Sequence, residues 1–198
     1  MSIALVMGGA QCLFEDIAAA EKLFKPDIIV AVKDIGITWP HVDHWVTYHP
    51  ERLPKELAER RRAGLPDPGQ IWAYQVPRKS GIDLPIKALT STKGGSSGLL
   101  GTEVALIVAT KAVLCGIPLD PKQVHYRRPR KGGWPPGQTY RLAWKAIYPK
   151  LKHRVRSMSG WTRELLGAPT KEWLFEDAAD TPPSEAGHAG VRTSSDVA

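Results

Sequence analysis

Residues 93–101 combine glycines with serines directly before an apolar stretch, residues 102–109. A glycine-rich loop that opens a helix exposes backbone N–H groups at the positive end of the helix dipole. Serine hydroxyls add further donors, and together these groups form a surface suited to a phosphate or carboxylate. A serine at this place can also cap the helix. The residues expected to bind an anionic group are Gly94, Gly95, Ser96 and Ser97.

Two further loops carry groups that bind nucleotides, and each follows a short apolar segment. A carboxylate at the end of a buried strand can accept hydrogen bonds from a ribose hydroxyl, and a lysine beside it can neutralise a phosphate. Neither loop has the glycine spacing of the dinucleotide-binding fingerprint or of the P-loop, so we exclude these two classes. The candidates are Gly8, Gly9 and Gln11 after residues 3–7, and Lys33 and Asp34 after residues 27–32.

Three histidines, His41, His44 and His49, lie close together in the chain. The alternating pattern over residues 44–49 predicts a strand, which places His49 at the carboxyl end of that strand. Imidazole titrates near neutral pH, so we predict that His49 transfers a proton, with Asp34 as the second candidate catalytic group. We expect no metal site, because a strand does not place His41 and His44 as ligands on one helix face.

The net charge of +7 is concentrated in one half of the chain. Residues 122–163 contain twelve Lys and Arg and no Asp or Glu, whereas residues 176–198 contain five acidic residues and one Arg. The basic segment, residues 122–163, is interpreted as a lid over a polyanionic ligand or as a nucleic-acid interface in which aromatic rings stack on bases. The candidate phosphate-binding residues in it are Arg127, Arg128 and Arg130.

The order of the expected elements indicates how these loops are positioned. Apolar and β-branched runs predict strands, helical spacing of apolar residues predicts the helices between them, and this alternation predicts an α/β fold with a mostly parallel sheet. Ligands of such folds bind outside the carboxyl ends of the strands, so the three loops should gather there. The expected strands are residues 3–7, 27–32, 44–49, 70–76, 86–89, 111–116 and 154–158, and the expected helices are residues 12–24, 50–64, 139–152, 161–166 and one after the glycine loop.

We expect one Rossmann-like three-layer domain over residues 1–175 that includes the basic segment, and a disordered acidic tail over residues 176–198. The two cysteines are too few for a disulfide framework, and no stretch approaches 18 apolar residues. The short apolar start of the chain is interpreted as a first strand and not as a signal peptide. These features favour the cytoplasm, without a membrane partner.

The segments ALVMGG, DIIVAVKDIG, VDHWVTYHPE and KGGSSGLLGTEVALIVATKAVLCGIPLD resemble the MptE-like group of Rossmann-like proteins. That group includes the archaeal 6-hydroxymethylpterin diphosphokinase and motility-associated glycosyltransferase-like proteins. The chain is also similar to small bacterial sialyltransferases and to phage or prophage proteins of unassigned function. The resemblance covers about residues 3–120. At the position after the second strand where these families usually carry Asn, this chain has Lys33 and Asp34.

The resemblance implies a nucleotide or nucleotide-sugar ligand and a glycosyl- or diphospho-transferase activity, with the cofactor otherwise unknown. A phage-encoded chain would work in the host cytoplasm. Two alternatives stand beside this expectation. One is a non-catalytic phage accessory protein that binds a nucleotide-like ligand, and the other is a nucleic-acid-binding module that uses the basic segment.

Overall fold

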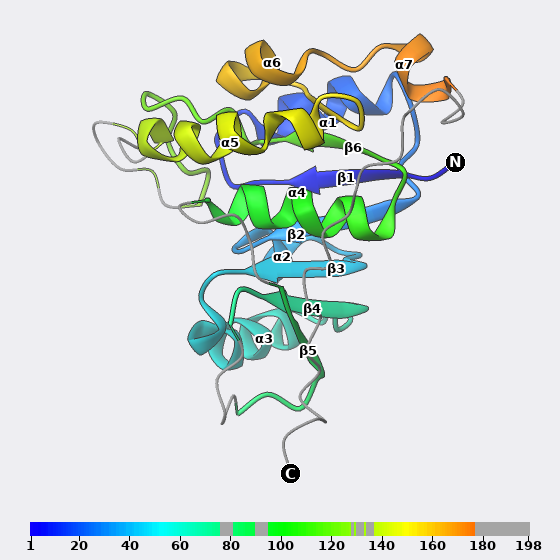
Figure 1. Ribbon diagram of the computed structural model, residues 1–198. Helices are drawn as coiled ribbons and strands as arrows, with labels where there is room; N and C mark the ends of the chain where they lie inside the picture. The colour runs from blue at the N-terminus through cyan, green and yellow to red at the C-terminus, as the bar shows by residue number, and fades with distance from the viewer. Residues whose placement is uncertain (76–80, 90–94, 128, 130–132, 134–136, 177–198) are drawn as a thin grey trace.

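The computed structural model describes residues 1–75, 81–89, 95–127, 129, 133 and 137–176. Seven strands form one sheet in the order β5-β4-β3-β2-β1-β6-β7 (Figure 1), and every neighbouring pair is parallel. The strands are β1 (Ile3–Met7), β2 (Ile28–Val32), β3 (His44–Thr47), β4 (Gln70–Ala73), β5 (Ile86–Ala88), β6 (Lys111–Cys115) and β7 (Val155–Ser157).

Helices cover both faces of this sheet, which confirms the predicted α/β class and its three layers. In Figure 1 the helix α4 runs across the front of the sheet, and it packs against β1, β2, β3 and β6. The helices are α1 (Leu13–Glu21), α2 (Ile35–Thr38), the 3₁₀ turn η1 (Pro50–Arg52), α3 (Leu53–Arg62), α4 (Ser97–Val108), α5 (Gly137–Leu151), α6 (Gly160–Leu166) and α7 (Lys171–Phe175).

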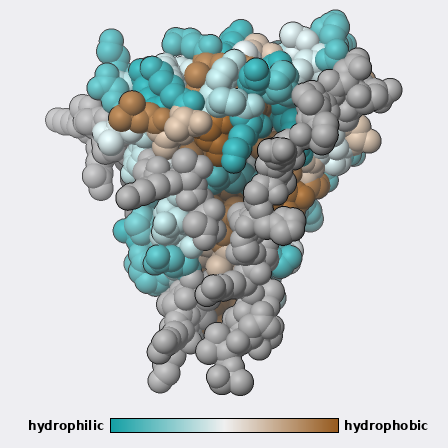
Figure 2. Space-filling model, in the orientation of Figure 1, coloured by the Kyte–Doolittle hydropathy of each residue, from teal (hydrophilic) through white to brown (hydrophobic). Residues whose placement is uncertain are grey.

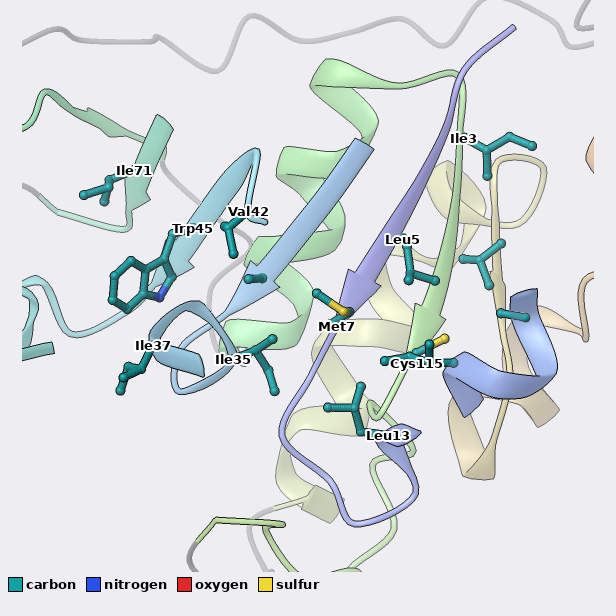
Figure 3. Packing of buried hydrophobic residues seen from close by; sticks show 14 of the residues in the cluster. Ile3, Leu5, Met7, Leu13, Ile35, Ile37, Val42, Trp45, Ile71 and Cys115 are labelled. Carbon is teal, nitrogen blue, oxygen red and sulfur yellow. The ribbon is translucent and has the colours of Figure 1, made fainter. Parts of the chain in front are cut away.

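The core consists of two apolar clusters, one on each face of the sheet. All residues of β1 and β6 are buried, as expected for central parallel strands that are covered on both faces. One cluster joins the sheet to α1, α2, α3 and α7 through side chains such as Leu13, Ile35 and Trp45 (Figure 3). The other cluster joins it to α4, α5 and α6. The sheet is therefore held from both sides, and its carboxyl edge stays in a fixed place.

The strand order reverses between β1 and β6. The chain adds strands on one side of β1 as far as β5, and then returns through α4 to place β6 on the other side of β1. The loops after β1 and β6 begin side by side, because the Gly8 N–H donates to the Cys115 carbonyl oxygen and the Ala10 N–H to the Gly116 carbonyl oxygen. In parallel α/β sheets, ligands bind beside such a reversal of strand order. This switch point lies at the carboxyl ends of both strands.

The structure differs from the sequence-based expectation in three places. The expected helix over residues 50–64 begins with the 3₁₀ turn η1, and the α-helix starts at Leu53. The short helices α2 and α7 were not predicted, because four or five residues are too few to show a helical period. The expected disordered tail falls almost entirely on residues 177–198, which lie outside the described residues.

Candidate functional site

A cavity of about 620 Å³ lies at the switch point, a size typical of small-molecule sites. Its wall contains parts of all three predicted loops, which confirms that they gather at the carboxyl edge of the sheet. Further walls come from the loop after β6 and from residues 123–125. The predicted site residues that line the cavity are Gly8, Gly9, Lys33, Asp34, His49, Gly95, Ser96 and Ser97.

Two predicted residues do not line this cavity. Gln11 is exposed, and its backbone N–H donates to the Val124 carbonyl oxygen at 2.9 Å. Arg127 points elsewhere, because its Nη2 pairs with Glu59 Oε1 on α3 at 2.7 Å. Three more predicted residues, Gly94, Arg128 and Arg130, lie outside the described residues.

The first turn of α4 forms one wall of the cavity. Ser96 is the N-cap, as predicted for one of the two serines, and its Oγ accepts a hydrogen bond from the Leu99 N–H at 3.3 Å. The N–H groups at the start of a helix have no partner within the helix, so those of Ser97 and Gly98 can bind a ligand. Four residues of this turn, Gly95 to Gly98, contact the cavity. This wall is suited to an anion, because the backbone N–H groups and the positive end of the helix dipole both attract negative charge.

Lys33 and Leu119 are the non-glycine residues with positive φ in the described part of the chain, at +52° and +48°. Both line the cavity. The Lys33 backbone is held in this conformation by its N–H bond to the Val46 carbonyl oxygen, and its own carbonyl oxygen accepts from Trp45 Nε1 at 2.8 Å. Such conformations cost about 1–3 kcal/mol each and concentrate at ligand sites. Both positions therefore lie where backbone conformations of this kind are often found.

His49 is oriented by a neighbouring carboxylate. Its Nδ1 lies 3.1 Å from Glu51 Oε1, and a carboxylate can only accept, so Nδ1 carries a proton. In the neutral ring the lone pair is then on Nε2. His49 lines the cavity, so a ligand there could meet a ring nitrogen that accepts a proton.

An aromatic wall lies beside this histidine. The rings of Tyr48 and Tyr74 are stacked, with centroids 4.8 Å apart and an angle of 24° between planes. Tyr48 lines the cavity, so the stack fixes the plane in which its ring is presented. Tyr140 at the start of α5 lines the cavity as well. A flat ligand ring such as a base can stack on a tyrosine held in this way.

Residues 123–127, here called the strap, pair with the loop after β1, and residues 123–125 line the cavity. The Tyr126 N–H donates to the Gly9 carbonyl oxygen at 3.0 Å, and Ala10 forms an antiparallel bridge with His125. The strap is fixed further by the pair of Arg127 with Glu59 and by a 3.0 Å contact between the hydroxyls of Tyr126 and Thr38. The first residues of the basic segment thus form part of the cavity wall.

The strap also brings in a residue that sequence reasoning missed. His125 Nε2 lies 3.5 Å from Asp34 Oδ2, and both residues line the cavity. Asp34 is nearly buried. The basic segment was the feature of the sequence that pointed to this region. His125 lies close to three arginines there, and the charge pattern favoured those arginines as the phosphate ligands.

Most other arginines of the basic segment that the structure describes bind backbone carbonyl groups. Arg154 donates to the carbonyl oxygens of Leu106, Ala109 and Thr110 at the end of α4, and burial lowers the pKa of its guanidinium. Arg141 binds Leu119 and lies over Trp161, and Arg156 lies over Trp173. Figure 2 shows hydrophilic residues spread over the upper part of the face where α5 and α6 lie. These arginines therefore hold parts of the fold together.

The thiols at this end of the fold are poor nucleophiles. Burial raises the pKa of the Cys12 thiol to about 11, and it raises the pKa of the Cys115 thiol as well. Both therefore stay protonated at neutral pH. Among the described residues, no three His, Cys, Asp or Glu side chains are grouped so that they could hold a metal ion. The helices of the described chain are also too short or too polar to cross a membrane.

Comparison with known proteins adds no family to this description. No protein-family model, no curated protein and no solved structure matches the chain.

Proposed function

We propose that this chain binds a nucleotide or nucleotide sugar in the switch-point cavity and transfers the group carried by its phosphate. The observation that carries the proposal is the meeting of three loops in one cavity: Gly8 and Gly9, Lys33 and Asp34, and the first turn of α4. Parallel α/β sheets bind nucleotides at this place for a physical reason, since helix N-termini and diverging loops meet there.

The parts of a nucleotide find matching groups on the cavity wall. Phosphates fit the turn of Ser97 and Gly98, and the cationic residues Lys33 and Arg52 line the same cavity. A ribose or sugar hydroxyl can donate to Asp34. A base fits the ring of Tyr48, which Tyr74 supports.

The transfer step requires a base, which the proposal assigns to His49. An acceptor hydroxyl gives its proton to the His49 Nε2 lone pair while its oxygen forms a bond to the transferred group. The bond from that group to the leaving phosphate oxygen breaks, and this oxygen keeps the electron pair. The helix dipole of α4 stabilises the negative charge that develops there.

Binding is tested by thermal unfolding with millimolar ADP, GDP, CDP or UDP, using the four uncharged nucleosides as matched controls. A diphosphate present at 100 times its Kd should stabilise the fold by about 2.7 kcal/mol. The nucleosides should stabilise it less, because they lack the group that the α4 turn binds. If no diphosphate raises the melting temperature, the proposal is wrong.

Turnover distinguishes the transferase from the non-catalytic binder. The protein is incubated with nucleotide sugars that bind, and ³¹P NMR follows the release of free nucleotide with water as acceptor. Wild-type protein should release it, and a His49→Gln variant should release it about 100-fold more slowly while still binding. Binding without release would support the non-catalytic alternative.

A Tyr48→Ala variant should bind nucleoside diphosphates about tenfold more weakly, because base stacking on an aromatic ring contributes about 1–3 kcal/mol. Its affinity for inorganic pyrophosphate, which has no base, should not change. Isothermal titration calorimetry measures both, with Tyr48→Phe as the control that keeps the ring. Equal losses for the diphosphate and for pyrophosphate would show that Tyr48 acts on the cavity shape and not on a base.

A further inference from the structure

We propose that His125 binds the anionic end of the ligand as a neutral hydrogen-bond donor through Nε2–H. This inference rests on the proposed function, since it names a ligand-binding residue of the same cavity. It separates the roles of two histidines: His49 presents a lone pair, and His125 presents a proton.

The proton of His125 is located by a backbone contact. The Arg127 N–H donates to His125 Nδ1 at 3.2 Å. A backbone N–H can only donate, so Nδ1 must hold a lone pair, and the single proton of the neutral ring is on Nε2. Protonation of Nδ1 would turn this contact into two donors facing each other. The strap therefore favours the neutral Nε2–H form of His125.

The ring is held in one orientation by several neighbours. It stacks on Tyr126, with ring centroids 5.4 Å apart and planes at 20°. It also lies directly against Gly9, where a Cβ atom would collide with Nε2. The backbone of the strap is bonded to Gly9 and Gln11, and Arg127 ties it to Glu59. A ring fixed in this way loses little rotamer freedom when a ligand arrives.

His125 Nε2 lies against Gly9 and beside Asp34, and all three residues line the cavity. His125 lines the cavity together with Gly8, Gly9 and the α4 turn. The distance from Nε2 to Asp34 Oδ2, 3.5 Å, is longer than an ordinary hydrogen bond, so a phosphate oxygen that enters the cavity beside the ring can become the better acceptor. Asp34 is then left to accept from a hydroxyl of the ligand. The chain thus uses His125 where the sequence suggested Arg127, which Glu59 holds away from the cavity.

The test uses three substitutions that separate the two ring nitrogens. His125→Gln can place an N–H group near the position of Nε2 but offers no acceptor to the Arg127 backbone N–H. Water can take the place of that acceptor, because the site is partly exposed. His125→Asn offers the acceptor but not the donor, and His125→Ala offers neither. The control is His41→Gln, because His41 forms a similar pair with Asp43 at 2.9 Å and lies outside the cavity.

Affinities are measured by calorimetry for pyrophosphate and for the diphosphate among ADP, GDP, CDP and UDP that stabilises wild type most. We expect His125→Asn and His125→Ala to weaken binding of both probes by about 10- to 100-fold, the effect of a lost hydrogen bond to a charged group. His125→Gln should stay within about threefold of wild type, like His41→Gln. Circular dichroism confirms that each variant is folded.

The outcomes separate the two proposals. If wild type binds none of the probes, the proposed function fails and this inference fails with it. If wild type binds and His125→Ala binds equally well, only the role of His125 is overturned. If folded His125→Asn keeps the affinity while His125→Gln loses it, the ring acts through Nδ1 and the donor assignment is wrong.

Discussion

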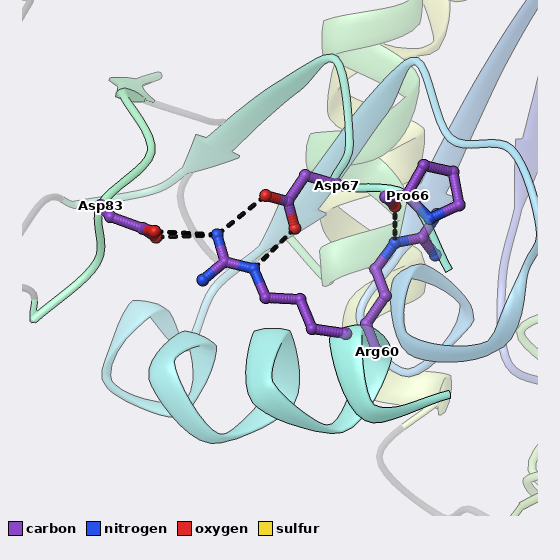
Figure 4. A network of polar contacts seen from close by, with 5 residues as sticks. Arg60, Pro66, Asp67 and Asp83 are labelled. Atoms are coloured by element: carbon purple, nitrogen blue, oxygen red, sulfur yellow. Dashed lines mark hydrogen bonds and ion pairs between the residues drawn. The ribbon is translucent and has the colours of Figure 1, made fainter. Parts of the chain in front are cut away.

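An Arg60→Ala variant should lose about 3 kcal/mol or more of its free energy of unfolding, the largest effect expected from one side chain outside the apolar core. Arg60 lies in the last turn of α3 and is fully buried. Its guanidinium donates to four carbonyl oxygens, and Figure 4 shows the one on Pro66. The other three belong to Gly36, Trp39 and Pro40. Alanine would leave these oxygens buried without a donor and would open a void beside them.

The loss should also reach the cavity, because Gly36 and Trp39 belong to the segment of α2 that directly follows Asp34. Urea unfolding measures the stability, and calorimetry with the best-binding diphosphate measures the effect on the site. The matched control is Arg62→Ala on the same helix. Arg62 is exposed and has one 3.3 Å contact with the Ala58 carbonyl oxygen, so its removal should change stability by about 0.5 kcal/mol at most. Equal stabilities of the two variants would show that Arg60 does not hold α2 to α3.

The run Arg60-Arg61-Arg62 also shows where prediction from the sequence ends. The sequence alone suggests the same role for all three arginines, a favourable interaction with the dipole at the end of the helix. In the structure, neighbouring helix positions point in different directions. Arg60 is buried on carbonyl groups, Arg61 pairs with Asp67 at 2.8 Å and Asp83 at 2.9 Å, and Arg62 faces solvent. The partners come from other segments, which the local sequence does not specify.

The sheet and its loops could be predicted because their signals are local. A continuous apolar run such as residues 3–7 identifies a central strand, and a glycine- and serine-rich loop before an apolar run identifies the start of a helix. In a parallel sheet the carboxyl ends of the strands lie at one edge, so the loops that follow them are expected to lie close together. His125 could not be predicted in the same way. Its role depends on the strap crossing to Gly9, and the pairing of two irregular segments leaves no pattern in the sequence.

A Ser97→Asp variant should lose affinity for diphosphates without losing stability. Ser97 is the first residue of α4 and lines the cavity, one position after the N-cap Ser96. A carboxylate in the first turn of a helix is favourable, so Ser97→Asp should leave the fold unchanged or stabilise it by up to about 1 kcal/mol. The same carboxylate occupies the place proposed for the phosphate. Two like charges about 4 Å apart repel by about 4 kcal/mol at an effective dielectric constant of 20.

Ser97→Asp should therefore weaken diphosphate and pyrophosphate binding about 100-fold or more, even where the melting temperature rises. Ser97→Asn has the same shape without the charge and should keep the affinity within a few fold of wild type. Calorimetry and thermal unfolding of the same samples give both quantities. A general loss of folding would lower stability and affinity together, so a stable variant that cannot bind identifies the α4 turn as the anion site. If Ser97→Asp binds pyrophosphate as wild type does, the phosphates lie elsewhere in the cavity.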